Sequence, residues 1–76
     1  MEYDEELDVS GKSCPIPIVK TRNKIQEMEE GEVLRTVSTD SGSKSDFEGW
    51  TDGSSDVELL DHEEKDGEYI FYVKKV

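Results

Sequence analysis

Two prolines in front of a run of helical periodicity restrict the fold of this chain more than any other feature. They are Pro15 and Pro17, in the stretch GKSCPIPIVKTRNKI at residues 11–25. Proline disrupts a helix interior but is tolerated in the first turn, because the first backbone N–H groups of a helix have no intrahelical acceptor. The prolines therefore fit the first and third positions of a helix, and Cys14 becomes the residue that caps it.

This first helix is predicted over residues 15–30. Its apolar side chains fall close to one stripe at helical spacing, polar and charged residues surround the stripe, and Gly31 offers a stop. The stripe comprises Ile18, Val19, Ile25 and Met28. Before the helix, residues 5–9 alternate apolar and polar side chains, which is typical of a short strand.

Three further strands are predicted in the rest of the chain. Residues 33–40 are rich in β-branched side chains and alternate in the manner of a strand. Residues 57–62 and 68–75 are also strand-like, and the Asp66-Gly67 pair between them is typical of a hairpin.

A second helix is predicted near residues 43–52, where the pattern is weakest. Phe47 and Trp50 lie three residues apart, as on one helix face. The surrounding glycines and serines oppose the helix, each glycine by up to ~1 kcal/mol. We therefore expect a short helix of low intrinsic stability.

The resulting order is β-α-β-α-β-β, and 76 residues leave room for one domain, residues 1–76. Two strands joined through a helix are expected to pair in parallel. The expected fold is an α/β (α+β) two-layer sandwich, in which two helices cover one face of a four-stranded mixed sheet.

The charge of the chain excludes some classes of partner. Twenty acidic and nine basic residues give a formal net charge of −11. This charge repels nucleic-acid phosphates, so direct nucleic-acid binding is not expected; a basic protein partner or a salt-rich cytoplasm accounts for it better. No apolar run approaches the ~20 residues of a membrane span, and MEYDEELDV lacks the character of a signal peptide. A cytoplasmic location without membrane association is therefore expected.

Cys14 is the single cysteine, so its chemistry is that of a lone thiol. With only His62 as a further soft ligand, no Cys/His metal site can form within one chain, and no cofactor is expected. A thiolate at a helix N-terminus is stabilised by the free N–H of Ile16 and by the helix dipole, and Lys12 and Lys20 are close enough in sequence to help. The pattern favours a reactive cysteine over a small buried one.

The stretch LDVSGKSCPIPIVKTRNKI resembles the CPxP signature region of the TusA/SirA family of small sulfur-carrier proteins. The similarity covers nearly the whole chain, including Asp40, Asp46, Trp50 and the final EEKDGEYIFYVKK. It implies the sheet order 1-2-4-3 with the last strand antiparallel to the others. It also implies that Cys14 accepts sulfane sulfur as a persulfide from a cysteine desulfurase or a rhodanese-like donor. An acceptor protein would then receive the sulfur for tRNA thiolation, molybdenum-cofactor enzymes or sulfur metabolism.

The candidate site follows from the motif and its surroundings. Its reactive segment is Cys14, Pro15, Ile16 and Pro17, and its partner-binding residues are Lys12, Lys20 and Lys44. The second helix departs from the family pattern, with SGSKS in place of an opening proline or alanine and TDGSSD after the tryptophan, so docking through basic charge there is weakened.

The implied role is that of a sulfurtransferase-type carrier more than of an enzyme with its own turnover. A second cysteine in CxxC spacing is missing, which argues against thiol-disulfide catalysis. Two alternatives stay open from the residues alone: a non-catalytic interaction or regulatory module on the same fold, and a redox-sensing thiol.

Overall fold

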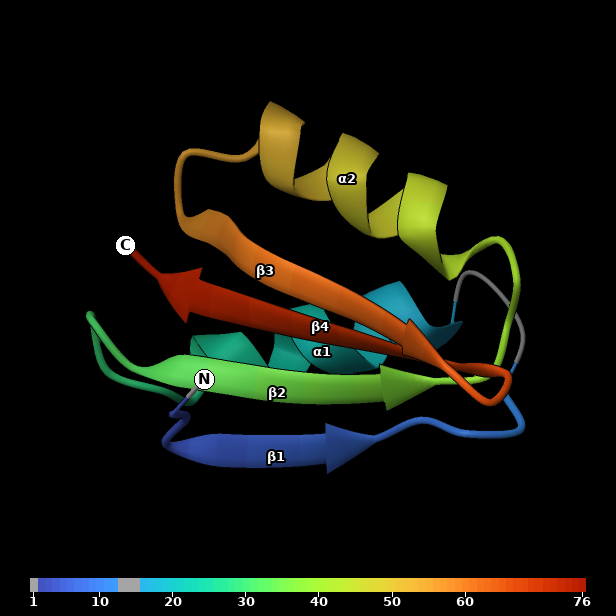
Figure 1. Ribbon diagram of the computed structural model, residues 1–76. Helices are drawn as coiled ribbons and strands as arrows, with labels where there is room; N and C mark the ends of the chain where they lie inside the picture. The colour runs from blue at the N-terminus through green and yellow to red at the C-terminus, as the bar shows by residue number, and fades with distance from the viewer. Residues whose placement is uncertain (1, 13–15) are drawn as a thin grey trace.

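The computed structural model describes residues 2–12 and 16–76, which form a four-stranded sheet with two helices on one face (Figure 1). In chain order the elements are β1 (Glu5–Asp8), α1 (Ile16–Gln26), β2 (Val33–Ser38), α2 (Ser43–Gly53), β3 (Val57–Lys65) and β4 (Glu68–Lys75). The two-layer fold predicted from the sequence is confirmed.

The sheet has the order β1-β2-β4-β3, as the family resemblance implies. β1 and β2 pair in parallel, and β4 is antiparallel to both of its neighbours, β2 and β3. The hairpin between β3 and β4 turns at Asp66 and Gly67, whose φ angles of 51° and 81° are both in the left-handed region. A two-residue turn of this kind matches the twist of the strands that it joins, which explains the Asp-Gly signal.

Several element boundaries differ from the sequence prediction, and the two largest differences are at the ends of α1 and β3. α1 ends at Gln26 and not at Glu30, because the last turn tightens and Met28 N–H donates to Ile25 O at 3.0 Å. Beyond it, the Lys75 ammonium group donates to Met28 O at 2.7 Å, so a residue of β4 satisfies the carbonyls that a longer helix would have used. β3 continues to Lys65, past a register irregularity at residue 60, because β4 offers pairing partners along its whole length.

The core lies between the helices and the sheet. Phe47 of α2 stacks on Phe71 of β4, with ring centroids 4.2 Å apart and planes at 4°. Both rings are fully buried, and they are the largest fully buried side chains among the described residues. The other members of this cluster are Ile25, Met28, Leu34, Val57 and Val73.

One predicted core residue of α1 is exposed. Val19 is 40% accessible, whereas Pro17 and Thr21 are fully buried. At 3.6 residues per turn, residue 19 lies about 200° around the helix from residue 17 and the same from residue 21, on the outer side. The helix therefore faces the sheet with a stripe of spacing four that includes a polar residue, and the apolar pattern alone misplaced it.

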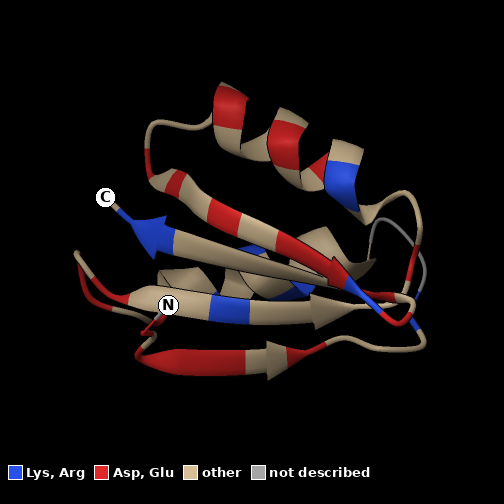
Figure 2. Ribbon diagram, viewed as in Figure 1, with Lys and Arg blue, Asp and Glu red and all other residues tan. Residues whose placement is uncertain are grey.

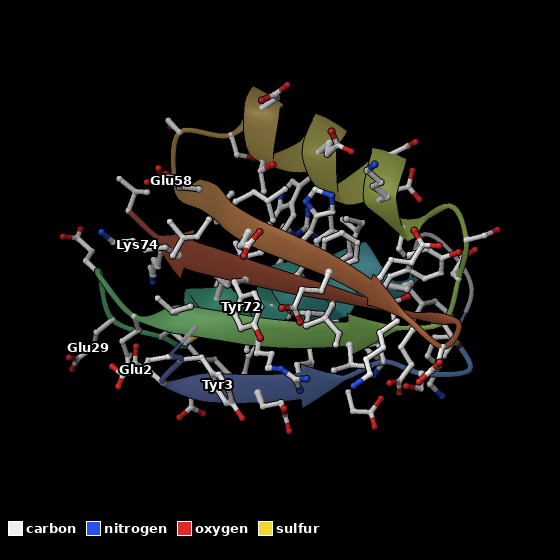
Figure 3. All side chains as sticks on the ribbon, in the orientation of Figure 1. Glu2, Tyr3, Glu29, Glu58, Tyr72 and Lys74 are labelled. Atoms are coloured by element: carbon white, nitrogen blue, oxygen red, sulfur yellow. The ribbon has the colours of Figure 1, made fainter. Side chains whose placement is uncertain are left out.

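The uncovered face of the sheet is protected by its own side chains. Val37, Ile70 and Tyr72 form a small buried cluster there. Tyr3 lies beside Tyr72 with ring centroids 6.4 Å apart (Figure 3), and Arg35 lies over the Tyr3 ring. A hydrogen bond to Tyr72 and an ion pair with Glu6 raise the pKa of the Arg35 guanidinium.

Within the described residues, neither helix is long and apolar enough to cross a membrane.

Candidate functional site

The candidate site lies at the end of the sheet where the parallel strands β1 and β2 finish. Each of these strands leads into a helix, so α1 and α2 both begin at this end, and the hairpin between β3 and β4 reaches it as well (Figure 1). The free N–H groups and the positive dipole ends of two helices are thereby gathered at one edge of the molecule.

The segment after β1 makes a tight turn. Val9 is buried and its N–H donates to Val37 O of β2 at 2.8 Å, which extends the parallel pairing by one residue. Asp8 Oδ1 accepts the Ser10 N–H at 2.9 Å, and hydrogen bonds from Ser10 lower the pKa of the Asp8 carboxyl. Gly11 has a φ of 78°, a conformation that residues with a Cβ rarely adopt. Lys12 follows, with its N–H donating to Val9 O at 3.2 Å.

A hydrogen bond ties this turn to the loop after β2. Gly11 N–H donates to Thr39 Oγ1 at 2.8 Å, across 28 positions of sequence. The loop itself is held by Asp40, whose Oδ1 accepts the Gly42 N–H at 3.1 Å just before α2 begins. The two loops that precede the helices therefore form one connected edge.

The CPxP motif is only partly within the described residues. Ser13, Cys14 and Pro15 lie outside them, so the predicted cap and the first proline position are not described. Ile16 is the first residue of α1 and is 42% exposed, and Pro17 lies buried in the first turn.

The charge of α1 differs from that of the rest of the chain. The helix carries Lys20, Arg22 and Lys24 and no acidic residue, although the chain as a whole has a net charge of −11. Acidic residues instead occupy β1, β3 and α2 (Figure 2). An anion near the start of α1 thus meets no carboxylate from that helix.

The three lysines predicted to bind partners are exposed but do not share one face. Lys12 lies in the turn after β1, and Lys44 is the second residue of α2. Lys20 lines a shallow hollow between α1 and β1 with Leu7, on the flank of α1 that faces away from α2. Within the described residues none of the three side chains forms an ion pair.

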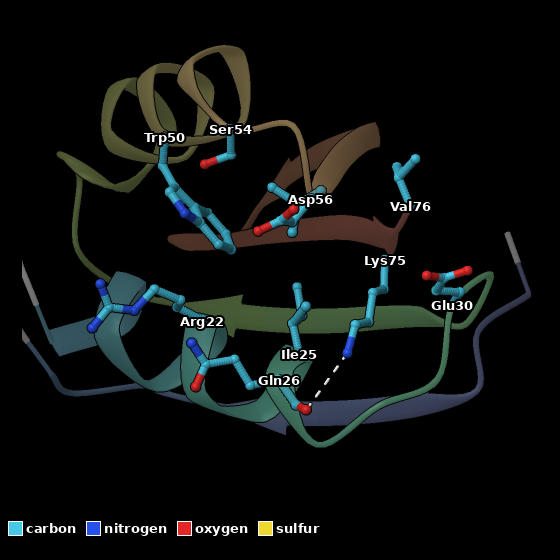
Figure 4. Close-up of a pocket in the computed structure, with 10 residues that line it drawn as sticks. Arg22, Ile25, Gln26, Glu30, Trp50, Ser54, Asp56, Lys75 and Val76 are labelled. Atoms are coloured by element: carbon cyan, nitrogen blue, oxygen red, sulfur yellow. Dashed lines mark hydrogen bonds between the residues drawn. The ribbon is translucent and has the colours of Figure 1, made fainter.

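A pocket of about 310 Å³ lies between the two helices, toward the end of α1 and away from its start (Figure 4). Ile25 lies at its base, and Trp50 forms a wall while packing edge-on against Phe47 at 5.9 Å. Arg22 of α1 and Asp56 after α2 stand at its rim. Trp50 is half-buried and packs against the core. The pocket has no sequence signal, because its walls come from segments that are far apart in the chain.

Comparisons with known proteins agree with this architecture. The family described as Sulfurtransferase TusA matches residues 5–75. A relative from Halobacterium salinarum, named as a candidate sulfur carrier protein, is 53% identical over 76 residues, covering 97% of this chain and 94% of the relative. The sulfur carrier protein TusA of Allochromatium vinosum is 36% identical and covers 97% of this chain and 96% of its own.

A solved structure supports the fold. The SirA-like protein of Desulfitobacterium hafniense superimposes with a TM-score of 0.76, covering 96% of this chain and 97% of the other, at 22% sequence identity. The matches at the level of sequence extend over almost the whole chain and include the segment that carries the cysteine. The chain belongs to the TusA/SirA family of small sulfur-carrier proteins.

Proposed function

We propose that Cys14 carries sulfane sulfur as a persulfide and passes it from a donor protein to an acceptor protein. The observation that carries the proposal is the placement of the single cysteine in a CPxP segment directly before α1, a helix without acidic residues. Family membership supports the carrier role, because the relatives are named for it.

The start of α1 suits an anionic sulfur. The N–H groups of a first helical turn lack intrahelical acceptors, and the helix dipole favours negative charge there by about 0.3–1 kcal/mol at exposed sites. Pro17 has no N–H, so the free donors of this turn include the Ile16 N–H. A persulfide is more acidic than a thiol, so the same environment favours the loaded state as an anion.

The transfer requires no external oxidant or reductant. The Cys14 thiolate attacks the terminal sulfur of a donor persulfide, a new S–S bond forms at Cys14, and the S–S bond of the donor breaks with release of the donor thiolate. The proton on the terminal sulfur moves with it or is lost to water. Attack by an acceptor thiolate on the terminal sulfur of Cys14 reverses these changes and regenerates the Cys14 thiolate.

The partners of this transfer are those that the family resemblance implies. A cysteine desulfurase or a rhodanese-like protein supplies the persulfide, and a protein of tRNA thiolation, molybdenum-cofactor or sulfur metabolism in the cytoplasm receives it. Ile16 and Val19, 42% and 40% exposed, form an apolar strip on the outer side of α1 next to Lys20. An apolar strip rimmed by positive charge fits a donor surface with acidic residues around an apolar centre.

Incubation with a cysteine desulfurase and cysteine tests the proposal. We expect intact-protein mass spectrometry to show a gain of one sulfur atom that maps to Cys14 and is removed by a thiol reductant. Peptide mapping after alkylation locates the adduct. The absence of any sulfur adduct would favour an interaction module, and oxidation of Cys14 by peroxide without sulfur loading would favour a redox sensor.

The lysines should affect transfer more than thiol acidity. In a Lys12→Ala, Lys20→Ala variant, we expect the alkylation rate of Cys14 near neutral pH to stay within about twofold of the parent, because exposed ammonium groups are screened by salt. The rate of sulfur loading at low salt should fall several-fold, since surface charge steers association. Mass spectrometry of samples quenched at successive times, at two salt concentrations, measures this rate.

The control for the lysine variant is Lys74→Ala, which removes a positive charge from the end of β4 that is remote from the start of α1. We expect its loading rate to remain close to that of the parent. An equal loss of loading rate in both variants would attribute the effect to net charge and would contradict a role for Lys12 and Lys20 in docking.

A further inference from the structure

Two buried pairs of hydroxyl groups connect β2 to the helices. Thr36 Oγ1 of β2 lies 3.4 Å from Thr21 Oγ1 of α1, and Ser38 Oγ of β2 lies 2.6 Å from Ser43 Oγ of α2. All four side chains are at most 1% exposed. Polar groups this deep in a small core persist only when they are hydrogen-bonded, so each pair fixes a helix to the central part of the sheet.

The pair on α1 extends to the reactive segment. The Thr21 hydroxyl donates to Pro17 O at 2.7 Å. A hydroxyl has one hydrogen to donate, so the Thr36 hydroxyl is the donor in its contact with Thr21. The bonds therefore run in one direction, from Thr36 of β2 through Thr21 to the backbone of the first turn of α1.

The series of hydrogen bonds from Thr36 ends at the carbonyl oxygen of Pro17. Pro17 is the second proline of the CPxP motif, it is fully buried, and it lies three residues after Cys14 in sequence. Its carbonyl also accepts the helical N–H of Thr21, so two hydrogen bonds from Thr21 converge on one oxygen of the first turn. A valine at position 21 would fill nearly the same space without the hydroxyl bond.

We propose that Thr21, supported by Thr36, is a positioning residue that holds the first turn of α1 in the orientation that stabilises the Cys14 thiolate. The inference rests on the proposed role of Cys14 as the sulfur-bearing residue. Thr21 acts through Pro17 and needs no contact with the sulfur. The Ser38–Ser43 pair performs the corresponding anchoring for α2, which does not carry the cysteine.

The test is the pH dependence of iodoacetamide alkylation of Cys14 in matched variants. For Thr21→Val we expect a raised apparent pKa of the Cys14 thiol and an alkylation rate at neutral pH lower by about two- to fivefold, the size of a helix-terminus interaction. Thr21→Ser keeps the hydroxyl and should restore the parental profile. Thr36→Val leaves the Thr21–Pro17 bond in place and should give a smaller shift.

The control is Ser43→Ala, which removes the equivalent buried pair on the other helix. We expect it to leave the Cys14 profile unchanged, with urea unfolding showing that it and the parent are folded. A profile for Thr21→Val that matches the parent, or an equal shift in Ser43→Ala, would overturn the assignment of Thr21. If Thr21→Val does not fold, Thr36→Val decides by the same comparison, and a parental profile there would also overturn the assignment.

Alkylation reports the thiolate without any sulfur donor, so this result is separate from that of the loading experiment. A parent chain that cannot be loaded with sulfur would remove the proposed function. If the parent loads normally but Thr21→Val has the same alkylation profile as the parent, only the positioning role of Thr21 is contradicted.

Discussion

Replacing Cys14 with serine should abolish sulfur loading and leave the fold intact. Serine is nearly isosteric and caps helices well, so the start of α1 loses little when the sulfur is replaced by a hydroxyl. A hydroxyl oxygen cannot form a persulfide under these conditions. We therefore expect no mass gain with a desulfurase and cysteine, and a free energy of unfolding within about 0.5 kcal/mol of the parent.

Mass spectrometry and urea unfolding on the same sample check both parts of this expectation. The parent chain blocked at Cys14 with iodoacetamide serves as a control with an unchanged sequence. A variant that fails to fold would make the cysteine a structural residue. A variant that still gains sulfur would show that Cys14 is not the carrier.

Replacing Phe47 with alanine should have the largest effect on stability. The ring is fully buried and stacks on Phe71, so its removal leaves a cavity between α2 and the sheet. Such truncations cost about 3–5 kcal/mol, and a domain of this size has a total stability of only about 5 kcal/mol. We expect urea unfolding, followed by the fluorescence of Trp50 next to Phe47, to show a chain near or beyond its midpoint without denaturant.

The matched control is Val19→Ala, a truncation on the exposed side of α1. Its cost should be within about 0.5 kcal/mol, because Val19 already contacts water and alanine is the better helix former. A Phe47→Ala chain with a parental urea midpoint would contradict the placement of the core between α2 and β4.

The order of elements was predictable because each one has a local signal. Phe47 and Trp50 at a spacing of three were sufficient to mark α2 despite its glycines, and Asp66-Gly67 marked the final hairpin. The sheet order came from the family resemblance, and the structure confirms it. Local pattern thus determines what the elements are, whereas their neighbours in the sheet are a property of the whole chain.

The sequence was least informative where distant residues decide the outcome. The end of α1 depends on Lys75, which is 49 positions from the carbonyl of Gln26 that it also approaches. Thr21 is buried because Thr36 is there to pair with it, and a threonine is otherwise a poor candidate for a core position. The separation of Lys20 from Lys44 depends on which flank of α1 faces α2, which the sequence does not state.

The central position of β4 has a consequence for synthesis of the chain. β4 lies between β2 and β3, although it follows both of them in the chain, and Lys75 also closes the end of α1. A nascent chain that stops before residue 68 holds only the β1–β2 pair and leaves β3 without its partner. β2 and β4 pair across more than 30 positions of sequence. Pairing across long sequence separations is slow and comes late in folding. We therefore expect residues 68–75 to leave the ribosomal tunnel before the domain acquires its structure, so that the candidate site is assembled only after β4 is available for pairing.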